Sequence, residues 1–194
     1  MKTYPVNEIF YSLQCEGFYT GTPAIFIRFS GCNLACPFCD TDHRRSVRMT
    51  LEDILEAIAG YPARHVVLTG GEPSLFVDEE LLHHLHGKGK YVAIETNGTR
   101  PLPVGIDWVT LSPKDSCCSN ATLALSSCDE LKQVFRDASS VSEYPEVKTL
   151  HRFLQPCDTG DGRASQIVAD TVEYCKEHPQ WRLSLQIHKV LNIR

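Results

Sequence analysis

The chain has 194 residues, of which 42% are hydrophobic and 22% are charged, a composition typical of a soluble globular protein with a single domain at residues 1–194. Its formal net charge is −5 with histidine neutral, and it contains no long basic run, so the sequence offers no electrostatic surface for DNA or RNA. No apolar stretch approaches the length of a membrane span and no signal peptide is evident, which predicts a cytoplasmic protein without membrane contact.

The hydrophobic pattern predicts strands that alternate with amphipathic helices. A short apolar run with β-branched and aromatic residues predicts a strand at 24–29. Further strands are predicted at 65–69, 91–95, 108–111, 130–134, 152–155 and 182–186. A helix is expected to begin at Thr50, which can cap its N-terminus, and to end at Gly60 and Pro62. Further helices are expected at 78–86 and 164–176.

This alternation is typical of βαβ units, whose strands form a parallel sheet. A complete eight-fold barrel needs about 200 to 250 residues or more. The chain therefore predicts an α/β fold, an incomplete TIM-like barrel of about six parallel strands with outer helices. The cysteine-rich loop after the first strand would then lie at the carboxyl edge of the sheet, where proteins of this architecture bind ligands.

Polar side chains follow most of the predicted strands at that edge. They come in short groups, at 69–72, 95–97, 112–114, 155–156 and 186–189. A sheet that merely folds needs turn residues there, but it does not need this many groups able to bind a polar ligand. We therefore expect one shared cavity at the carboxyl ends of the strands.

The segment CNLACPFC carries Cys32, Cys36 and Cys39, three of the nine cysteines in the chain. An odd number of cysteines argues against a secreted disulfide scaffold, and clustered cysteines in a reducing compartment are more often metal ligands or catalysts. Three thiolates on one tight loop can each bind one iron of a 4Fe–4S cluster and leave the fourth iron open for a chelating cofactor. Such a cluster can pass one electron to a bound sulfonium compound and break a carbon–sulfur bond.

Two other interpretations of this segment stay open from the residues alone. A structural zinc site would need a fourth ligand from Cys15, His43 or a distant cysteine, and the spacing of the three thiols fits zinc knuckles poorly. Buried cysteines without a ligand are the second alternative, although chance rarely places three within eight residues. The remaining cysteines Cys117, Cys118, Cys128 and Cys175 are interpreted as ordinary small residues.

The cysteine loop resembles the signature of the radical S-adenosylmethionine superfamily. The turn GGEP at 70–73 also resembles that family's turn for the methionine amino group, although alone it could only connect a strand to a helix. The resemblance implies that Phe38 lies near the adenine of S-adenosylmethionine. It also implies that the glycines let the backbone approach this ligand closely.

Motifs from Tyr4 to Arg194 resemble those of the 7-carboxy-7-deazaguanine synthase family, in the same order. They are LQCEG, FIRFSGCNLACPFCDT, TGGEP, ETNG, SPK, LQP and HKVLNIR. The resemblance implies a homodimer that converts 6-carboxy-5,6,7,8-tetrahydropterin to 7-carboxy-7-deazaguanine and ammonia, a step toward queuosine and other 7-deazapurines. It implies a 4Fe–4S cluster, S-adenosylmethionine, Mg²⁺ and an external one-electron donor.

The same resemblance implies roles for individual positions. Cys32, Cys36 and Cys39 would hold the cluster, and Thr41 would bind Mg²⁺ together with the substrate. Contacts with S-adenosylmethionine are expected from Phe38, Cys39, Asp40, Gly71, Ser112, Pro113, Lys114, Gln155, Pro156, Cys157 and Asp158. The pterin pocket is expected to be lined by Leu13, Gln14, Cys15, Arg28 and Thr69, with the C-terminal carboxylate of Arg194 at the pterin edge.

Some of these positions also allow a purely structural interpretation. The guanidinium of Arg28 could pair with the substrate carboxylate, or it could form a salt bridge with an acidic residue of the chain. Without the resemblance, Thr41 would be a turn residue and Lys114 a surface lysine. Cys15 departs from the family, which usually has glycine there, so it could be strained or could narrow the pocket.

Two other functions are compatible with parts of the pattern. A glycyl-radical activase would use the same chemistry, but it would need a groove that admits a peptide loop of a partner protein. The chain length and LQCEG argue against this activity. A non-catalytic binding module would be stabilised by stoichiometric zinc in place of iron and sulfide.

Overall fold

The computed structural model describes residues 2–39, 41–42, 45–160 and 162–194. The strands are β1 (Tyr4–Leu13), β2 (Pro23–Phe29), β3 (Val47–Met49), β4 (His65–Gly70), β5 (Tyr91–Thr96), β6 (Trp108–Leu111), β7 (Glu130–Phe135), β8 (His151–Pro156) and β9 (Arg182–Leu183). The helices are α1 (Leu51–Ile58), α2 (Glu79–Gly87), α3 (Ala164–Glu177) and α4 (Ile187–Leu191), with short 3₁₀ helices η1 (Pro73–Leu75) and η2 (Ala138–Ser140).

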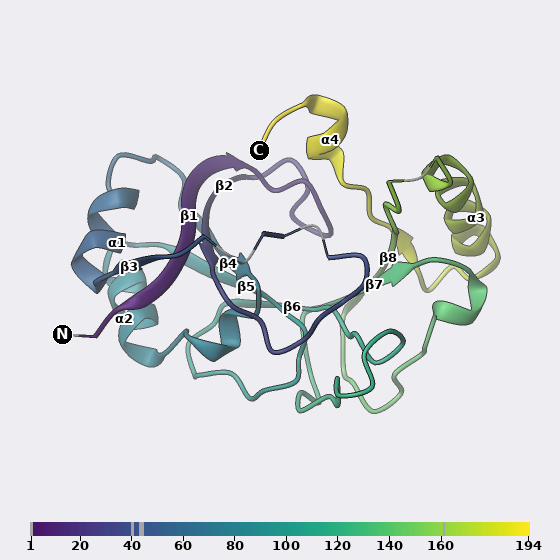
Figure 1. Cartoon of the computed structure of the whole chain (residues 1–194), viewed down its shortest axis with the longest axis horizontal. Coiled ribbons are helices and arrows are strands. Elements are labelled where there is room, and N and C mark those ends of the chain that lie inside the picture. Colours follow the sequence, from purple (N-terminus) through teal and green to yellow (C-terminus); the bar gives the residue numbers. More distant parts are fainter. Residues whose placement is uncertain (1, 40, 43–44, 161) are drawn as a thin grey trace.

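In the part of the chain that the structure describes, nine strands form one sheet, in the order β3-β1-β2-β4-β5-β6-β7-β8-β9 (Figure 1). Neighbouring strands from β2 to β9 are parallel, whereas β1 pairs antiparallel with both β2 and β3. The predicted α/β fold with a mostly parallel sheet is therefore confirmed. None of the helices in the described ranges is long and apolar enough to cross a bilayer.

The strand prediction was wrong at both ends of the sheet. It missed the edge strand β3, and it missed β1, in which polar Asn7 and Glu8 and a bulge interrupt the alternation of apolar residues. The cysteine-rich loop still follows the first parallel strand, β2, but β1 precedes that strand. At the other end β9 stops at Leu183, short of the predicted 186, and the chain then forms α4, which was not predicted.

The helix predictions were accurate. The side chain of Thr50 accepts a hydrogen bond from the backbone N–H of Asp53, and the Asp53 carboxylate accepts one from the backbone N–H of Thr50. This reciprocal capping box satisfies two backbone donors at the start of α1. The predicted helices at 78–86 and 164–176 are α2 and α3, each within one residue of the expected bounds.

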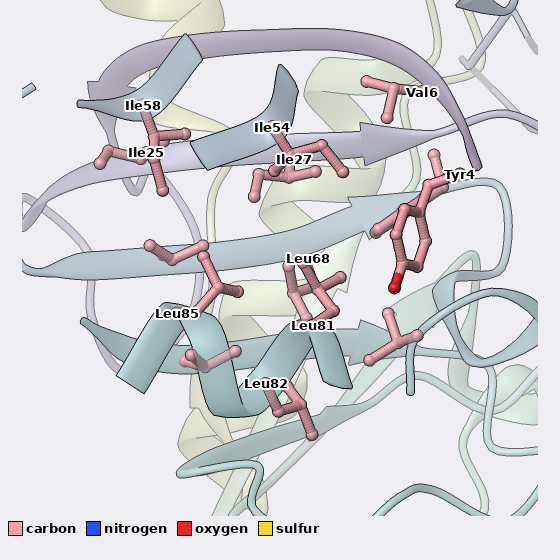
Figure 2. Packing of buried hydrophobic residues seen from close by; sticks show 14 of the residues in the cluster. Tyr4, Val6, Ile25, Ile27, Ile54, Ile58, Leu68, Leu81, Leu82 and Leu85 are labelled. Atoms are coloured by element: carbon pink, nitrogen blue, oxygen red, sulfur yellow. The ribbon is translucent and has the colours of Figure 1, made fainter. Parts of the chain in front are cut away.

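One face of the sheet packs against α1 and α2. Apolar side chains that alternate along β2 and β4, among them Ile25, Ile27 and Leu68, are fully buried against these helices (Figure 2). The helices contribute Ile54, Ile58, Leu81, Leu82 and Leu85 to the same cluster. Full burial of each such side chain stabilises the fold by roughly 1.5 to 3 kcal/mol, so this cluster holds the sheet in place under the site.

The opposite face of the sheet carries the intervening residues of the same strands. Near the amino ends of the strands these are apolar and form a second cluster, which includes Phe26, Val67, Ala93 and Trp108. Since side chains alternate between faces, the next residue of this row in each strand points to the same side, closer to the carboxyl end. Those positions carry the polar groups of the site described below.

Candidate active site

A cavity of about 930 Å³ lies at the carboxyl ends of the parallel strands. Its wall includes the last but one residue of each of the parallel strands β2, β4, β5, β6, β7 and β8. These residues are Arg28, Thr69, Glu95, Thr110, Val134 and Gln155. Strand alternation points these residues away from the apolar cluster behind the sheet and into the cavity. The single shared cavity expected from the sequence is therefore present.

The cavity brings together almost all residues predicted for the site. Of those expected around the cluster, S-adenosylmethionine and Mg²⁺, the wall contains Cys32, Cys36, Phe38, Cys39, Thr41, Gly71, Ser112, Lys114, Gln155, Pro156, Cys157 and Asp158. Of those expected around the pterin, it contains Leu13, Gln14, Cys15, Arg28, Thr69 and Arg194. Pro113 is buried beside the wall and does not line it, and Asp40 lies outside the described residues.

The cysteine loop presents three thiols to this cavity. Burial raises the pKa of Cys32, and burial together with a hydrogen bond to the thiol of Cys118 raises the pKa of Cys36 to about 12. The thiols of Cys32 and Cys36 are therefore protonated in the metal-free chain, and metal binding would release their protons. Three sulfur donors on one loop, open to one ligand-sized cavity, fit the requirements of a 4Fe–4S cluster.

The GGEP turn is fixed by the buried carboxylate of Glu72, which is only 1% exposed. One oxygen accepts hydrogen bonds from Thr96 Oγ1 at 2.7 Å and from the backbone N–H of Ser74 at 3.0 Å, and the other accepts from the backbone N–H of Asn97 at 2.7 Å. The Asn97 amide in turn donates to Asn33 Oδ1 at 3.0 Å, in the cysteine loop. Glu72 thus joins the ends of β4 and β5, and Asn97 continues this network to the cysteine loop.

The two glycines of the turn are required by close backbone packing. Gly70 has φ +121°, which side chains rarely tolerate, and a Cβ on it would overlap the backbone of Phe29. A Cβ on Gly71 would overlap the carbonyl of Gly31, which accepts a hydrogen bond from the backbone N–H of Glu72 at 2.9 Å. The sequence suggested close approach to a ligand, and the structure shows close approach to the start of the cysteine loop.

A buried group of charges that the sequence reasoning missed lies deeper in the cavity. Lys132, which is 7% exposed, forms an ion pair with Glu16 and lies 3.9 Å from Glu95 Oε1. Burial alone would lower the pKa of Lys132, but the carboxylates of Glu16, Glu95 and Glu130 raise it. Burial alone would raise the pKa of Glu16, but the charge of Lys132 and hydrogen bonds from Lys132 and Gln186 lower it.

Gln14 and Thr69 hold the carboxylate of Glu95 in the cavity wall. Thr69 Oγ1 donates to Glu95 Oε2 at 2.7 Å, and Gln14 Nε2 lies 3.2 Å from Glu95 Oε1. Gln14 Oε1 accepts the backbone N–H of Cys15 at 2.9 Å. Cys15 is 5% exposed and is not among the residues with positive φ, so a side chain is accommodated there without backbone strain.

Arg28 forms a salt bridge, which was the structural alternative raised by the sequence. Its Nε donates to Glu8 Oε1 at 3.1 Å, and the guanidinium of Arg194 contacts Glu8 Oε2 at 2.6 Å. The main-chain oxygen of Arg194 accepts from Ser12 Oγ at 2.5 Å. Glu8 thus holds two predicted substrate ligands at one side of the cavity. The guanidinium of Arg28 has further N–H groups that the Glu8 contact does not use.

Lys114 is a half-buried residue of the cavity wall and not a surface lysine. Its Nζ donates to the backbone oxygen of Ser112 at 2.7 Å and to Ser112 Oγ at 2.5 Å. Across the cavity, Asp158 pairs with Lys189 at 2.5 Å, and hydrogen bonds from Lys189 and the backbone of Gly160 lower the pKa of Asp158. The loop after β6 and the loop after β8 are therefore held in place by local contacts before a ligand binds.

Comparison with known proteins identifies the family. A 7-carboxy-7-deazaguanine synthase of Bacteroides thetaiotaomicron is 52% identical over 189 residues, which cover 97% of this chain and 98% of that protein. The chain belongs to the 7-carboxy-7-deazaguanine synthase family. The synthase of Bordetella pertussis is 44% identical, with 98% and 99% of the two chains covered. The crystal structure of QueE from Escherichia coli matches with a TM-score of 0.75 and 32% identity, over 95% of this chain and 94% of that chain.

Membership of the 7-carboxy-7-deazaguanine synthase family makes the chain an enzyme of the radical S-adenosylmethionine type. The sequence model of the Radical SAM superfamily matches residues 26–116, which include the cysteine loop and the GGEP turn. A 4Fe–4S cluster and S-adenosylmethionine are the cofactors that this superfamily implies. The family decides against the two alternatives considered above, a glycyl-radical activase and a non-catalytic zinc module.

Proposed function

We propose that this chain converts 6-carboxy-5,6,7,8-tetrahydropterin to 7-carboxy-7-deazaguanine and ammonia. The observation that carries the proposal is the shared cavity, since the cysteine loop lines the same space of about 930 Å³ as Arg28, Thr69 and Gln14. Ligand sites are typically about 300 to 1,000 Å³, so this one has room for a sulfonium cofactor beside a bicyclic substrate. The names of the relatives support the same reaction.

Cys32, Cys36 and Cys39 would hold the 4Fe–4S cluster. When bound and reduced by an external donor, the cluster supplies the electron that cleaves S-adenosylmethionine and starts hydrogen abstraction from the substrate. The chain itself orients the two reactants. The backbone of the GGEP turn, fixed by Glu72, would receive the amino group of the methionine moiety, and Phe38 would lie near the adenine.

Arg28 would orient the pterin by its carboxylate, since a guanidinium offers paired N–H donors that match a carboxylate. On the cavity wall, the carboxylate of Glu95 is fixed by Thr69 and Gln14 and would accept N–H groups of the pterin ring. Fixed donors and acceptors at both ends of a bicyclic substrate would leave it one orientation. The stacked rings of Phe10 and Phe26, with centroids 4.8 Å apart, would keep water from the apolar floor.

Several finer features belong to the same proposal. Mg²⁺ would be bound by the hydroxyl of Thr41, the substrate carboxylate and waters, because Mg²⁺ takes few protein ligands in sites of this kind. The chain would act as a homodimer, which is supported by the exposed apolar side chains of Val190, Leu191 and Ile193 near α4. A cytoplasmic location would suit a chain with nine cysteines, because a reducing compartment keeps cysteines as thiols.

The sheet would be an incomplete barrel within one domain of residues 1–194. Its strands from β2 to β9 follow one another in sequential parallel order, as in a barrel wall. Helices α1, α2 and α3 cover one face of these strands, and the other face carries the cavity. This arrangement would expose the cluster loop and the substrate ligands to the same interior.

The decisive experiment is a single anaerobic assay. Reconstituted, reduced protein is incubated with S-adenosylmethionine, Mg²⁺ and the carboxypterin, and products are identified by mass spectrometry. We expect 7-carboxy-7-deazaguanine and ammonia from the wild type and from the matched control Cys175→Ala in α3, and neither product from Cys36→Ala. Methionine and deoxyadenosine without any deazaguanine would refute the substrate, and a chain that takes up no iron and sulfide would refute the whole proposal.

A further inference from the structure

Three thiols from two different loops converge at the edge of the cavity. Cys118 Sγ lies 3.7 Å from Cys36 Sγ and 3.6 Å from Cys117 Sγ, and all three sulfur atoms lie within 4.8 Å of one another. Among the residues that the structure describes, no other group of three histidine, cysteine, aspartate or glutamate side chains places its potential metal-binding atoms within this distance of one another. Cys36 and Cys118 are separated by 82 positions in the chain, so the fold brings them together.

The spacing of these sulfur atoms matches one metal ion. Zinc–thiolate bonds are about 2.3 Å long, and a tetrahedron with that bond length has sulfur atoms about 3.8 Å apart. Two of the three sulfur pairs have this separation. In a cubane cluster each cysteine binds a different iron. The three thiols are therefore arranged for a mononuclear site.

The loop that carries Cys117 and Cys118 is anchored. The backbone N–H groups of both cysteines donate to the carbonyl oxygen of Lys114, at 3.0 and 2.8 Å. The neighbouring Asp115 forms a hydrogen bond with Tyr144, and the backbone oxygen of Ser116 accepts from Arg136 at 3.2 Å. The thiol of Cys117 donates to the same carbonyl oxygen at 3.2 Å, and in this arrangement both vicinal sulfur atoms lie within 4.8 Å of Cys36 Sγ.

The charges around the group suit a bound dication. Three thiolates and one divalent cation carry a net charge of −1, and the ammonium of Lys114 interacts electrostatically with both Cys36 and Cys117. The side chains of Cys36 and Lys114 line the cavity, so a water molecule can reach the fourth tetrahedral position from there.

We propose that Cys36, Cys117 and Cys118 form a second metal site, which binds one thiophilic divalent cation such as Zn²⁺ in the cluster-free chain, with water as the fourth ligand. Binding converts three thiols to thiolates and releases three protons to solvent. Cys36 is also a ligand of the proposed cluster, so the two metal centres compete for it. The competition rests on the proposed function, whereas the mononuclear site does not.

Cobalt binding to cluster-free protein tests the site directly. Reduced, metal-free chain is titrated anaerobically with Co²⁺, and thiolate-to-cobalt charge transfer and tetrahedral d–d absorption report the ligand set. Two matched double variants separate the possible ligands, Cys117→Ser with Cys118→Ser and Cys32→Ser with Cys39→Ser. Circular dichroism checks that both variants fold. If the Cys117/Cys118 double variant does not fold, the single variant Cys118→Ser replaces it in the titration.

We expect one Co²⁺ per chain in the wild type and in the Cys32/Cys39 variant, and displacement by Zn²⁺. The Cys117/Cys118 variant should bind Co²⁺ roughly 100-fold more weakly or worse, since even the loss of a hydrogen-bond partner of a metal ligand costs 10- to 100-fold in affinity. Undiminished Co²⁺ binding in the Cys117/Cys118 variant would overturn the site. Loss of Co²⁺ binding in the Cys32/Cys39 variant, or a wild type that binds no Co²⁺, would also overturn it.

Competition with the cluster is measured separately. Wild-type chain loaded with one Zn²⁺ should take up iron and sulfide several-fold more slowly than metal-free chain, as followed by visible absorption. The Cys117/Cys118 variant should show no such delay. Equal delays in both proteins would refute the competition. A wild type that binds Co²⁺ as expected but takes up no cluster would instead refute the proposed function and leave the mononuclear site standing.

Discussion

Thr96 at the end of β5 donates a hydrogen bond of 2.7 Å to the buried carboxylate of Glu72, just after β4. This contact connects the carboxyl ends of two neighbouring parallel strands through a charge-assisted bond. The same carboxylate also accepts the backbone N–H groups of Ser74 and Asn97. The GGEP turn is therefore shaped from within the protein, before any ligand arrives.

Replacement of this carboxylate should destabilise the fold. In Glu72→Gln one acceptor oxygen becomes an N–H₂ group that faces existing donors, so the free energy of unfolding should fall by about 2 to 3 kcal/mol. Urea unfolding of metal-free protein measures the loss. The exposed Glu177→Gln in α3 should stay within about 0.5 kcal/mol of wild type. Equal stability of the two variants would show that the Glu72 network contributes nothing.

The packing of the turn on the cysteine loop gives a second prediction. Gly71→Ala forces a methyl group against the carbonyl of Gly31, and overpacking of this kind costs about 1 to 3 kcal/mol. The variant should also load less cluster, because the start of the cysteine loop must move. Gly60→Ala is the matched control, since a Cβ there meets nothing within 4 Å. Urea unfolding and iron content measure both effects, and a normally stable, fully loaded Gly71→Ala would contradict the packing argument.

Local rules explain which parts of the fold were predictable. The start of α1 is fixed by Thr50 and Asp53, whose interaction spans three residues and is visible in the sequence. The strand β1 is stabilised by pairing with β2 and with β3, of which β3 is distant in the chain, and its polar Asn7 and Glu8 hide its apolar face. Pairing that depends on distant partners leaves no local pattern.

The residues of the site also fall into those that the sequence predicted and those that it did not. Motif residues such as Gly71 and Cys32 were predicted because their chemistry requires a fixed spacing. The ion pair of Lys132 with Glu16 was missed, although a lysine within the predicted strand at 130–134 is a signal that could have indicated it. The approach of Cys118 to Cys36 had no signal in the sequence, because only the folded loops bring these two residues together.

The Glu16–Lys132 pair should make stability depend on pH in acid. The pKa of Glu16 is lowered in the folded chain, so its contribution is present above the ordinary carboxyl pKa of 4.5 and is lost as the pH falls through the folded value. In Glu16→Gln the buried Lys132 loses its closest partner, which should cost about 3 kcal/mol near neutral pH. The difference from wild type should shrink as the pH falls below about 4.

Urea unfolding at a series of pH values measures this difference. Burial raises the pKa of Glu130, which acts in the opposite direction, but Glu130 is present in both proteins. Glu173→Gln, in which an exposed surface pair with Lys176 is removed, should change the stability little at any pH. A Glu16→Gln penalty that stays constant from neutral to acid pH would show that the pair is not the source of the dependence.

Arg28 has two possible roles, and kinetics can separate them. If its guanidinium binds the substrate carboxylate, Arg28→Met should lower kcat/KM for the carboxypterin by about 10- to 150-fold, the equivalent of one charged hydrogen bond of roughly 1.5 to 3 kcal/mol. Cleavage of S-adenosylmethionine without substrate should persist. Glu8→Gln removes the same salt bridge but keeps the guanidinium, so it should lose far less, and the exposed Arg64→Met should match wild type. Should Glu8→Gln reproduce the full loss, Arg28 would serve the fold and not the substrate.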